Sequence, residues 1–142
     1  MARSSGNVEA LNKQIVEAGF ARWVKGAGSP FESLAEDATW TIVGNSPVSR
    51  TFTDREDFMA EVIRPFNARM SSPLVPTVKG IYADGDMVVV LFDGKATARD
   101  GEPYVNSYAW FLQMRADRIV KVTAFFDTIE FTDLWTRVTP AM

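Results

Sequence analysis

The side chains that most often carry out enzyme chemistry near neutral pH are missing from this sequence of 142 residues, which contains no Cys and no His. Without Cys there is no thiol nucleophile, no disulfide and no cysteine ligand for a metal. Without His there is no imidazole base and no histidine ligand. Acid–base chemistry must therefore use Asp, Glu, Tyr or Lys, and we predict neither a metal nor a cofactor.

A first group of candidate residues follows from the turn signal Asp100-Gly101, because Asp-Gly between two apolar runs is typical of a tight β-hairpin. If this turn has two residues, Asp93 lies directly opposite Tyr108 and Leu91 lies opposite Trp110. These four side chains would then share one face of the sheet.

A second group follows from Ala116-Asp117, which we interpret as another two-residue turn. Asn106 would then lie opposite Asp127, on the same face as the first group. A bulge in the last strand would instead bring Phe126 onto this face in place of Asp127. The face is mainly apolar and aromatic with a few converging polar groups, which is typical of a small-molecule site.

Asp93 is our first candidate for a general acid or base. A carboxylate enclosed by Leu91, Tyr108 and Trp110 would lose water, so its pKa should rise and it could exchange a proton near neutral pH. Two alternatives stay open. Asp93 could lie in an exposed bulge, because the following Gly94 makes the segment turn-like, or the whole polar face could be the solvated one.

Asp127 is the second candidate acid or base, and Asn106 and Tyr108 are expected to donate hydrogen bonds to a reacting oxygen. The opposite face of the same strands is apolar enough to be an interface or a core wall, and it carries Val88, Val90, Phe92, Val105, Ala109 and Phe111. We therefore expect a homodimer that forms through the outer face of the sheet.

The elements that position these residues follow from the spacing of apolar side chains. Helical spacing predicts a helix over residues 8–24, a short helix after Ser29-Pro30, and a long helix that begins at a Thr53/Glu56 capping box and ends before Pro73. Alternating and β-rich runs predict strands over residues 38–43, 75–82, 87–98, 104–114 and 119–128, followed by a helical tail over 131–138. Helices followed by strands predict one α+β domain over residues 1–142, with residues 1–7 flexible.

Charge and hydropathy limit the partners. The chain has 15 Lys and Arg against 18 Asp and Glu, with the signs interspersed, so we expect neither nucleic acid nor a membrane surface as a partner. The polar start of the chain and the lack of a long apolar run favour a cytoplasmic protein.

Three segments of the chain resemble the nuclear-transport-factor-2-like (NTF2-like) superfamily, and within it the SnoaL-like and ketosteroid-isomerase-like proteins. They are Leu-Ala-Glu-Asp-Ala-Thr-Trp at 34–40, the loop from Gly44-Asn45-Ser46-Pro47 to Glu56, and Phe125-Phe126-Asp127. The resemblance implies a cone-shaped domain in which a strongly bent antiparallel sheet wraps around the N-terminal helices and leaves a cavity.

The catalytic residues of two branches of this superfamily do not carry over. The base position of ketosteroid isomerase falls at about Ile42, and its protonated Asp falls at about Asn106. Of the charged groups of the epoxide-hydrolase branch, one Asp matches Asp93, but Leu91 and Ala124 replace the Arg and the second Asp. Asn45 matches an Asn that helps to hold a water in that branch, although it also fits a turn residue.

We expect the cavity to be lined by Trp23, Trp40 and Phe66 from the helices and the first strand, and by Leu91, Trp110 and Phe126 from the later strands. The predicted function is a cofactor-independent isomerase, dehydratase or cyclase that acts on a small hydrophobic ring compound. The first alternative is a non-catalytic protein that binds such a compound in the same cavity. The second is a structural dimerisation domain with a filled core.

Overall fold

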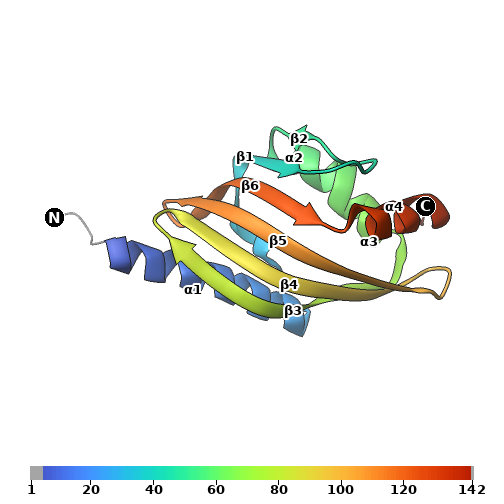
Figure 1. Cartoon of the computed structure of the whole chain (residues 1–142), viewed down its shortest axis with the longest axis horizontal. Coiled ribbons are helices and arrows are strands. Elements are labelled where there is room, and N and C mark those ends of the chain that lie inside the picture. Colours follow the sequence, from blue (N-terminus) through green and yellow to red (C-terminus); the bar gives the residue numbers. More distant parts are fainter. Residues whose placement is uncertain (1–4, 142) are drawn as a thin grey trace.

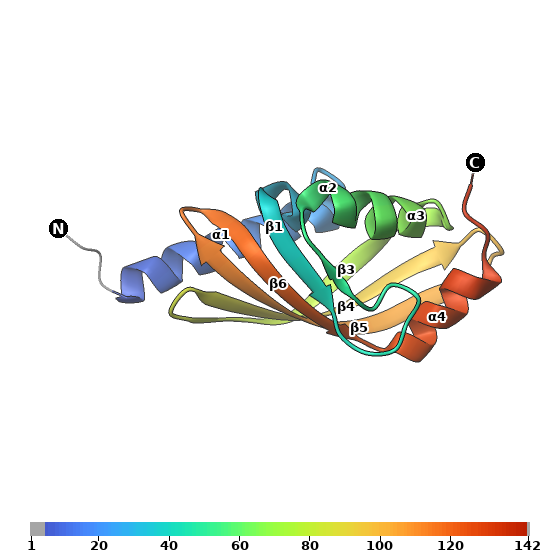
Figure 2. The same ribbon diagram turned by 90° about the horizontal axis from the view of Figure 1, so that it is seen from above.

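The computed structural model describes residues 5–141 and shows a six-stranded sheet with helices on one side of it (Figure 1 and Figure 2). The strands lie in the order β2-β1-β6-β5-β4-β3. Their bounds are Leu34–Ile42 for β1, Thr51–Phe52 for β2, Met70–Asp84 for β3, Met87–Ala98 for β4, Pro103–Arg115 for β5 and Arg118–Phe126 for β6. The α+β prediction is confirmed, but the sheet is mixed, because β1 pairs with β6 in parallel.

The helices enclose the hydrophobic core against the sheet. Helix α1 (Ser5–Lys25) packs on β3 and β4, and Figure 2 shows it on the same side of the sheet as α2 and α3. A second helical stretch consists of α2 (Arg55–Phe58), a π-helical turn η2 (Met59–Ile63) and α3 (Arg64–Asn67). Helix α4 (Thr128–Arg137) follows β6 and contacts β5.

The helix starts agree with the sequence prediction at one position and differ at two. The short 3-10 helix η1 (Pro30–Ser33) has Ser29 as its N-cap, as predicted. Helix α2 is capped by Asp54, whose carboxylate accepts the Asp57 N–H at 2.7 Å, so the predicted cap at Thr53 is wrong. Helix α1 already begins at Ser5, whereas the rest of the predicted flexible segment 1–7, residues 1–4, lies outside the described residues.

The hairpin between β4 and β5 has a three-residue loop, and this overturns the predicted register. Ala98 and Glu102 are bonded across the loop, and Gly101 closes it with a φ of 88°. Such loops end in a left-handed residue, for which Gly is favoured. The Asp-Gly signal fits both loop lengths. Asp93 consequently lies opposite Ser107 rather than Tyr108.

The hairpin between β5 and β6 has the predicted two-residue turn, with Arg115 opposite Arg118 and with Ala116 and Asp117 both at positive φ. A bulge beside Gln113 and Met114 then shifts the pairing by one residue, so Tyr108 lies opposite Phe126. The alternative that places Phe126 on the inner face is therefore confirmed.

Even-numbered residues of β4 and β5 face the core. Val88, Val90 and Phe92, which we expected on the outer face, are at most 1% exposed. Val105 does lie on the outer face and is 51% exposed. Side chains alternate between the two faces of a strand, so a difference of one residue in the register places every β4 residue on the face opposite to the predicted one.

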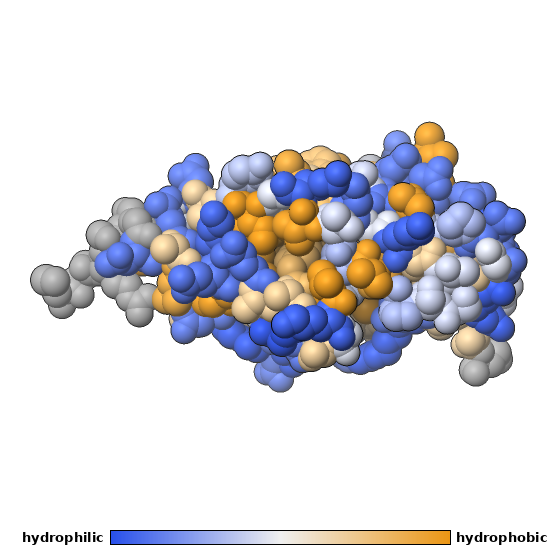
Figure 3. Space-filling view, turned by 90° about the horizontal axis from the view of Figure 1, so that it is seen from below, coloured by the Kyte–Doolittle hydropathy of each residue, from blue (hydrophilic) through white to orange (hydrophobic). Residues whose placement is uncertain are grey.

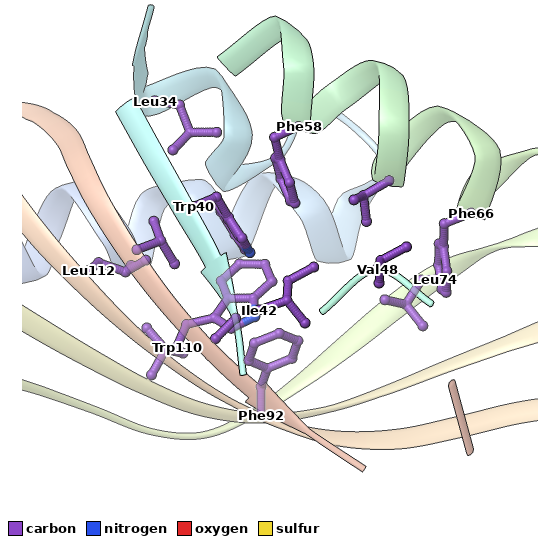
Figure 4. Close-up of a cluster of buried hydrophobic side chains, with 14 of the residues drawn as sticks. Leu34, Trp40, Ile42, Val48, Phe58, Phe66, Leu74, Phe92, Trp110 and Leu112 are labelled. Carbon is purple, nitrogen blue, oxygen red and sulfur yellow. The ribbon is translucent and has the colours of Figure 1, made fainter. Parts of the chain in front are cut away.

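Aromatic side chains from four elements meet among the aliphatic residues of the core (Figure 4). Trp40 of β1 stacks on Phe58 of α2 with ring centroids 4.1 Å apart. Trp110 of β5 meets Trp40 edge-on at 5.0 Å and Phe92 of β4 at 4.8 Å. Such pairs add stability beyond the area that they bury, so this cluster holds the helices and the sheet in a fixed relation.

Candidate binding cavity

A cavity of about 530 Å³ lies between the helices and the inner face of the sheet. On the face shown in Figure 3, hydrophobic side chains gather around a hollow near the middle of the molecule. Nine aromatic side chains line the cavity: Trp23, Phe31, Trp40, Phe58, Phe66, Tyr108, Trp110, Phe126 and Phe131. Aliphatic residues from the π-helical turn and from β1, β3 and β6 complete the apolar lining, among them Met59, Val62, Ile63, Ile42, Leu74 and Ala124.

Few polar side chains line the cavity, and those that the structure describes there carry no charge. Side-chain hydroxyl groups and an amide come from Ser29, Asn67, Ser71 and Ser72, and the phenol comes from Tyr108. Among the described residues that line the cavity there is no Asp, Glu, Lys or Arg, and Tyr108 is the one titratable group. The cavity therefore offers hydrogen bonds but no fixed charge.

Tyr108 belongs to a hydrogen-bonded chain of three residues on β5. Its hydroxyl lies 2.8 Å from the hydroxyl of Tyr104, which in turn accepts a hydrogen bond of 2.8 Å from Nδ2 of Asn106. The alternating positions 104, 106 and 108 place all three side chains on the inner face of the strand.

Burial keeps both phenols protonated. Desolvation raises the pKa of Tyr104 to about 12, and it raises the pKa of Tyr108 well above its usual value. The ring of Tyr108 also stacks on Phe92 with centroids 4.8 Å apart and an interplanar angle of 6°. At neutral pH, Tyr108 is therefore a rigid neutral hydrogen-bonding group in the cavity wall.

Asn106 is 3% exposed and uses both ends of its amide on its surroundings. Oδ1 accepts the backbone N–H groups of Ser107 at 2.8 Å and Asp127 at 3.0 Å. Nδ2 donates to the backbone oxygen of Asp127 at 3.0 Å as well as to Tyr104. Asn106 therefore connects the start of α4 to the tyrosine pair instead of lining the cavity itself.

The structure places Asp93 outside the cavity, which corrects its predicted position in the wall. Its carboxylate accepts a hydrogen bond of 2.9 Å from Ser107 Oγ and lies 3.4 Å from Lys79 Nζ, on the outer face of the sheet. Its side chain is 42% exposed. The alternative that Asp93 is exposed to solvent therefore describes its position correctly.

Asp127 also does not line the cavity. It is exposed and caps helix α4, where its carboxylate accepts the N–H groups of Ile129 at 3.0 Å and Glu130 at 3.3 Å. Asp is among the preferred N-cap residues, which explains its position. Both carboxylates proposed as acid or base are therefore directed away from the cavity.

Six of the predicted site residues line the cavity as expected, namely Trp23, Trp40, Phe66, Tyr108, Trp110 and Phe126. Leu91 is on the outer face and 40% exposed. Asn45 is exposed in the loop after β1, close to the turn that Ser46 and Ser49 close with a hydroxyl–hydroxyl contact of 2.7 Å. The turn interpretation of Asn45 therefore fits the structure.

The sequence prediction missed Phe31, Phe58 and Phe131 of the lining. Phe58 is one of the apolar residues whose helical spacing predicted the second helix. That spacing does not show whether a side chain lines a cavity or fills the core. Tyr104 was also missed, although its position two residues before Asn106 placed it on the same strand face.

Two further properties concern the described residues as a whole. Within residues 5–141 no helix combines the length and the apolar character that crossing a bilayer requires. The same part of the chain brings no three His, Cys, Asp or Glu side chains together in a way that could hold a metal ion.

Comparison with known proteins places this geometry in a family. The model of the SnoaL-like domain matches residues 16–122. No protein with a curated description matches the chain.

Solved structures share the fold at low sequence identity. A putative SnoaL-like polyketide cyclase from Jannaschia sp. CCS1 is 15% identical, with a TM-score of 0.72 over 96% of this chain and 97% of that one. TerC, co-crystallised with polyporic acid, is 17% identical, with a TM-score of 0.71 over 89% and 98%. A protein with a ketosteroid-isomerase-like fold from Catenulispora acidiphila DSM 44928, in complex with trimethylamine, is 22% identical, with a TM-score of 0.60 over 78% and 83%.

Proposed function

This chain belongs to the SnoaL-like family, and we propose that it binds a small, neutral, flat hydrophobic ring compound in the cavity without chemical turnover. The observation that carries this proposal is a lining of nine aromatic side chains in which the described residues supply no carboxylate, Lys or Arg. A charged ligand would lose its hydration there without gaining a partner, so a neutral ligand is favoured.

The size of the cavity suits a compound of a few fused rings. Its volume of about 530 Å³ falls within the range of roughly 300–1,000 Å³ that is typical of small-ligand sites. Flat rings match walls made of Trp and Phe, because aromatic pairs stack or meet edge-on. The structural relative crystallised with polyporic acid supports the idea that this fold accommodates small organic molecules.

The positions of the carboxylates support binding without turnover. General acid–base catalysis needs a group within hydrogen-bond reach of the reacting proton. Asp93 lies on the outer face and Asp127 caps α4. Tyr108 remains, and its raised pKa makes it a poor base at neutral pH.

The tryptophans provide a direct test of binding. Three of the four Trp residues, Trp23, Trp40 and Trp110, line the cavity, so an occupied cavity should change the intrinsic fluorescence strongly. We expect saturable quenching by 9-fluorenone, a neutral tricyclic probe. Val62→Phe should weaken this binding because Val62 lines the cavity, whereas Val105→Phe on the outer face should not.

The opposite results would contradict the proposed function. Quenching that does not saturate, or equal affinity in Val62→Phe and in the wild type, would show that the probe binds outside the cavity. Circular dichroism of both variants checks that the substitutions leave the fold intact.

An enzyme of the isomerase or cyclase kind is the second candidate, and one observation favours it. The Tyr108 hydroxyl, backed by Tyr104 in an apolar cavity, could stabilise an oxyanion that develops on a bound ketone. Deuterium exchange next to the carbonyl of 2-tetralone in D₂O would separate the two functions. Exchange accelerated by the wild type but not by Tyr108→Phe indicates an enzyme, and binding without accelerated exchange indicates a binding protein.

We also propose that the chain forms a homodimer through the outer face of the sheet. Leu91, Val105 and Phe125 are 40–51% exposed there, and Phe111 packs on Phe125 with centroids 5.7 Å apart. Ala109→Glu would place an unpaired charge in the interface and should shift the protein to monomer in analytical ultracentrifugation. Ala60→Glu, on the exposed side of η2, is the matched control, and a wild type that sediments as a monomer would contradict the dimer.

A further inference from the structure

The orientation of the Asn106 amide is determined by backbone groups whose roles are unambiguous. Its Oδ1 faces two N–H donors, those of Ser107 and Asp127, at 2.8 and 3.0 Å. Its Nδ2 faces the carbonyl oxygen of Asp127 at 3.0 Å. Turning the amide around would place two donors against donors and an acceptor against an acceptor, so Nδ2 must point toward Tyr104.

The direction of the next hydrogen bond follows from this orientation. Tyr104 Oη accepts from Asn106 Nδ2, so its own proton needs another acceptor. Among the described residues, the acceptor in contact with it is Tyr108 Oη, at 2.8 Å. Tyr104 is 1% exposed, and a buried hydroxyl proton without an acceptor is costly. Tyr104 therefore donates to Tyr108.

The hydroxyl proton of Tyr108, the last group in this series of hydrogen bonds, remains free for a ligand. Tyr108 receives the hydrogen bond from Tyr104 and lines the cavity. Successive hydrogen bonds in one direction polarise one another, which strengthens the terminal donor. The three side chains form a one-way relay from Asn106 through Tyr104 to Tyr108.

We propose that Asn106 is a positioning residue that determines ligand class: through this relay it makes Tyr108 a hydrogen-bond donor, so the cavity selects ring compounds that present a bare carbonyl oxygen. Ketones and quinone-type carbonyls accept a hydrogen bond without bringing a proton of their own. A hydroxyl in the same place would leave its proton without an acceptor beside Tyr108. This inference rests on the proposed function, since it concerns the ligand of the same cavity.

Three probes of nearly the same shape test the selection. They are 9-fluorenone with a carbonyl, 9-fluorenol with a hydroxyl, and fluorene with neither. Trp quenching measures their affinities, and infrared spectroscopy of bound 9-fluorenone reports a donated hydrogen bond as a shift of the carbonyl stretch to lower frequency. We expect 9-fluorenone to bind about fivefold or more tightly than fluorene, the ratio that one neutral hydrogen bond provides. We expect 9-fluorenol to bind more weakly than 9-fluorenone.

Asn106→Asp tests whether Asn106 sets the direction. The carboxylate would accept from Tyr104 instead of donating to it, so Tyr108 would turn its proton toward Tyr104 and present an acceptor to the cavity. The preference should change to 9-fluorenol, and the carbonyl shift should disappear. Tyr108→Phe should abolish the shift and the preference, whereas Tyr82→Phe at an exposed position should leave both unchanged.

If Asn106→Asp does not fold, a second variant tests whether the relay determines the direction of the Tyr108 hydrogen bond. Tyr104→Phe removes the donor behind Tyr108 but keeps the contacts between Asn106 and Asp127, and it should reduce the carbonyl shift. A wild type that prefers 9-fluorenol, or that shows no carbonyl shift, would overturn the inference. So would Asn106→Asp and Tyr104→Phe variants that have the same preference and the same carbonyl shift as the wild type. Failure of all three probes to bind the wild type would instead contradict the proposed function itself.

Discussion

Gly94 of β4 faces the ring of Tyr108 across the inner surface of the sheet, where a Cβ atom on Gly94 would lie 3.1 Å from Tyr108 Cε1. The same Cβ atom would lie 2.9 Å from Cδ1 of Leu74, which also lines the cavity. The absence of a side chain at position 94 thus leaves the space in which the tyrosine ring stacks on Phe92.

Gly94→Ala should therefore weaken ligand binding by displacing Tyr108 and Leu74. We expect an affinity loss of about tenfold and a destabilisation of about 1 kcal/mol, because overpacking a filled site strains its neighbours. Quenching titrations and urea unfolding measure the two effects. Unchanged affinity in a folded Gly94→Ala variant would show that the ring of Tyr108 does not need this space.

Alkaline pH should destabilise the protein through the buried tyrosines. In the unfolded chain Tyr ionises near pH 10, whereas burial raises the pKa of Tyr104 to about 12 in the folded protein. Between these values the unfolded state has lost a proton that the folded state retains, so the free energy of unfolding falls as pH rises. The loss from Tyr104 should reach about 2–3 kcal/mol.

Urea unfolding at about pH 9 and about pH 11.5 measures this dependence. Tyr104→Phe should have a lower free energy of unfolding at about pH 9, because Asn106 loses an acceptor, but a flatter decline with pH. Tyr82→Phe is the control for the exposed phenol. A decline that is equally steep in Tyr104→Phe and in the wild type would exclude Tyr104 as its source.

Arg69 joins α3 to the end of α4 without a carboxylate partner among the described residues. It is 7% exposed and donates to the backbone oxygens of Val138 at 2.9 Å, Trp135 at 3.3 Å and Pro65 at 2.9 Å. Its guanidinium carbon lies 3.8 Å from the centre of the Trp135 ring, and desolvation lowers its pKa. The guanidinium thus satisfies carbonyl groups that the helix ends leave free.

Arg69→Met should lower the free energy of unfolding by about 2–4 kcal/mol, since buried carbonyl groups lose a charged donor. Arg50 provides the matched control, because it also lies over an aromatic ring, at 3.9 Å from the centre of Phe52, but is half exposed. Arg50→Met should cost less than about 1 kcal/mol. Equal losses in the two variants, measured by urea unfolding, would contradict the bridging role of Arg69.

The turn between β5 and β6 offers a stabilising substitution. Ala116 and Asp117 adopt φ values of 50° and 68°, the conformation in which Asn-Gly is favoured. Replacing them with Asn-Gly should raise the free energy of unfolding by about 1 kcal/mol, because a left-handed conformation is costly for Ala. A thermal melt checks the gain, and an unchanged midpoint would show that this turn adapts at no cost.

The spacing of apolar residues was sufficient to predict most of the helices and strands, but it was insufficient to predict which strands pair. The strand over residues 87–98 has the bounds that alternation predicted, since its side chains alternate strictly between core and solvent. The parallel pairing of β1 with β6 joins residues far apart in the sequence, and no turn between them signals it. The two-residue strand β2 was too short to produce a pattern.

The candidate site depended on one ambiguity that the turn motif alone could not resolve. Asp100-Gly101 is compatible with a two-residue turn and with the end of a three-residue loop, and the choice determines the face on which Asp93 lies. The alternation of Val88, Val90 and Phe92 with Asp93 and Lys95 contained the answer, since a strand with three large apolar residues on one face and Asp and Lys on the other turns the apolar face inward, as the burial of these three residues shows.

The π-helical turn at Met59–Ile63 makes the cavity wall sensitive to chain length as well as to residue type. Such a turn corresponds to one residue inserted into an α-helix. Deleting one residue there would restore a regular helix, and because the wide turn already absorbs the extra residue, Phe58 before it and Phe66 after it would keep their faces. The wall would then lose one side chain of the turn itself. Descendants of this chain could therefore acquire a differently shaped cavity through a single-codon deletion, with every side chain that lines the sheet side unchanged.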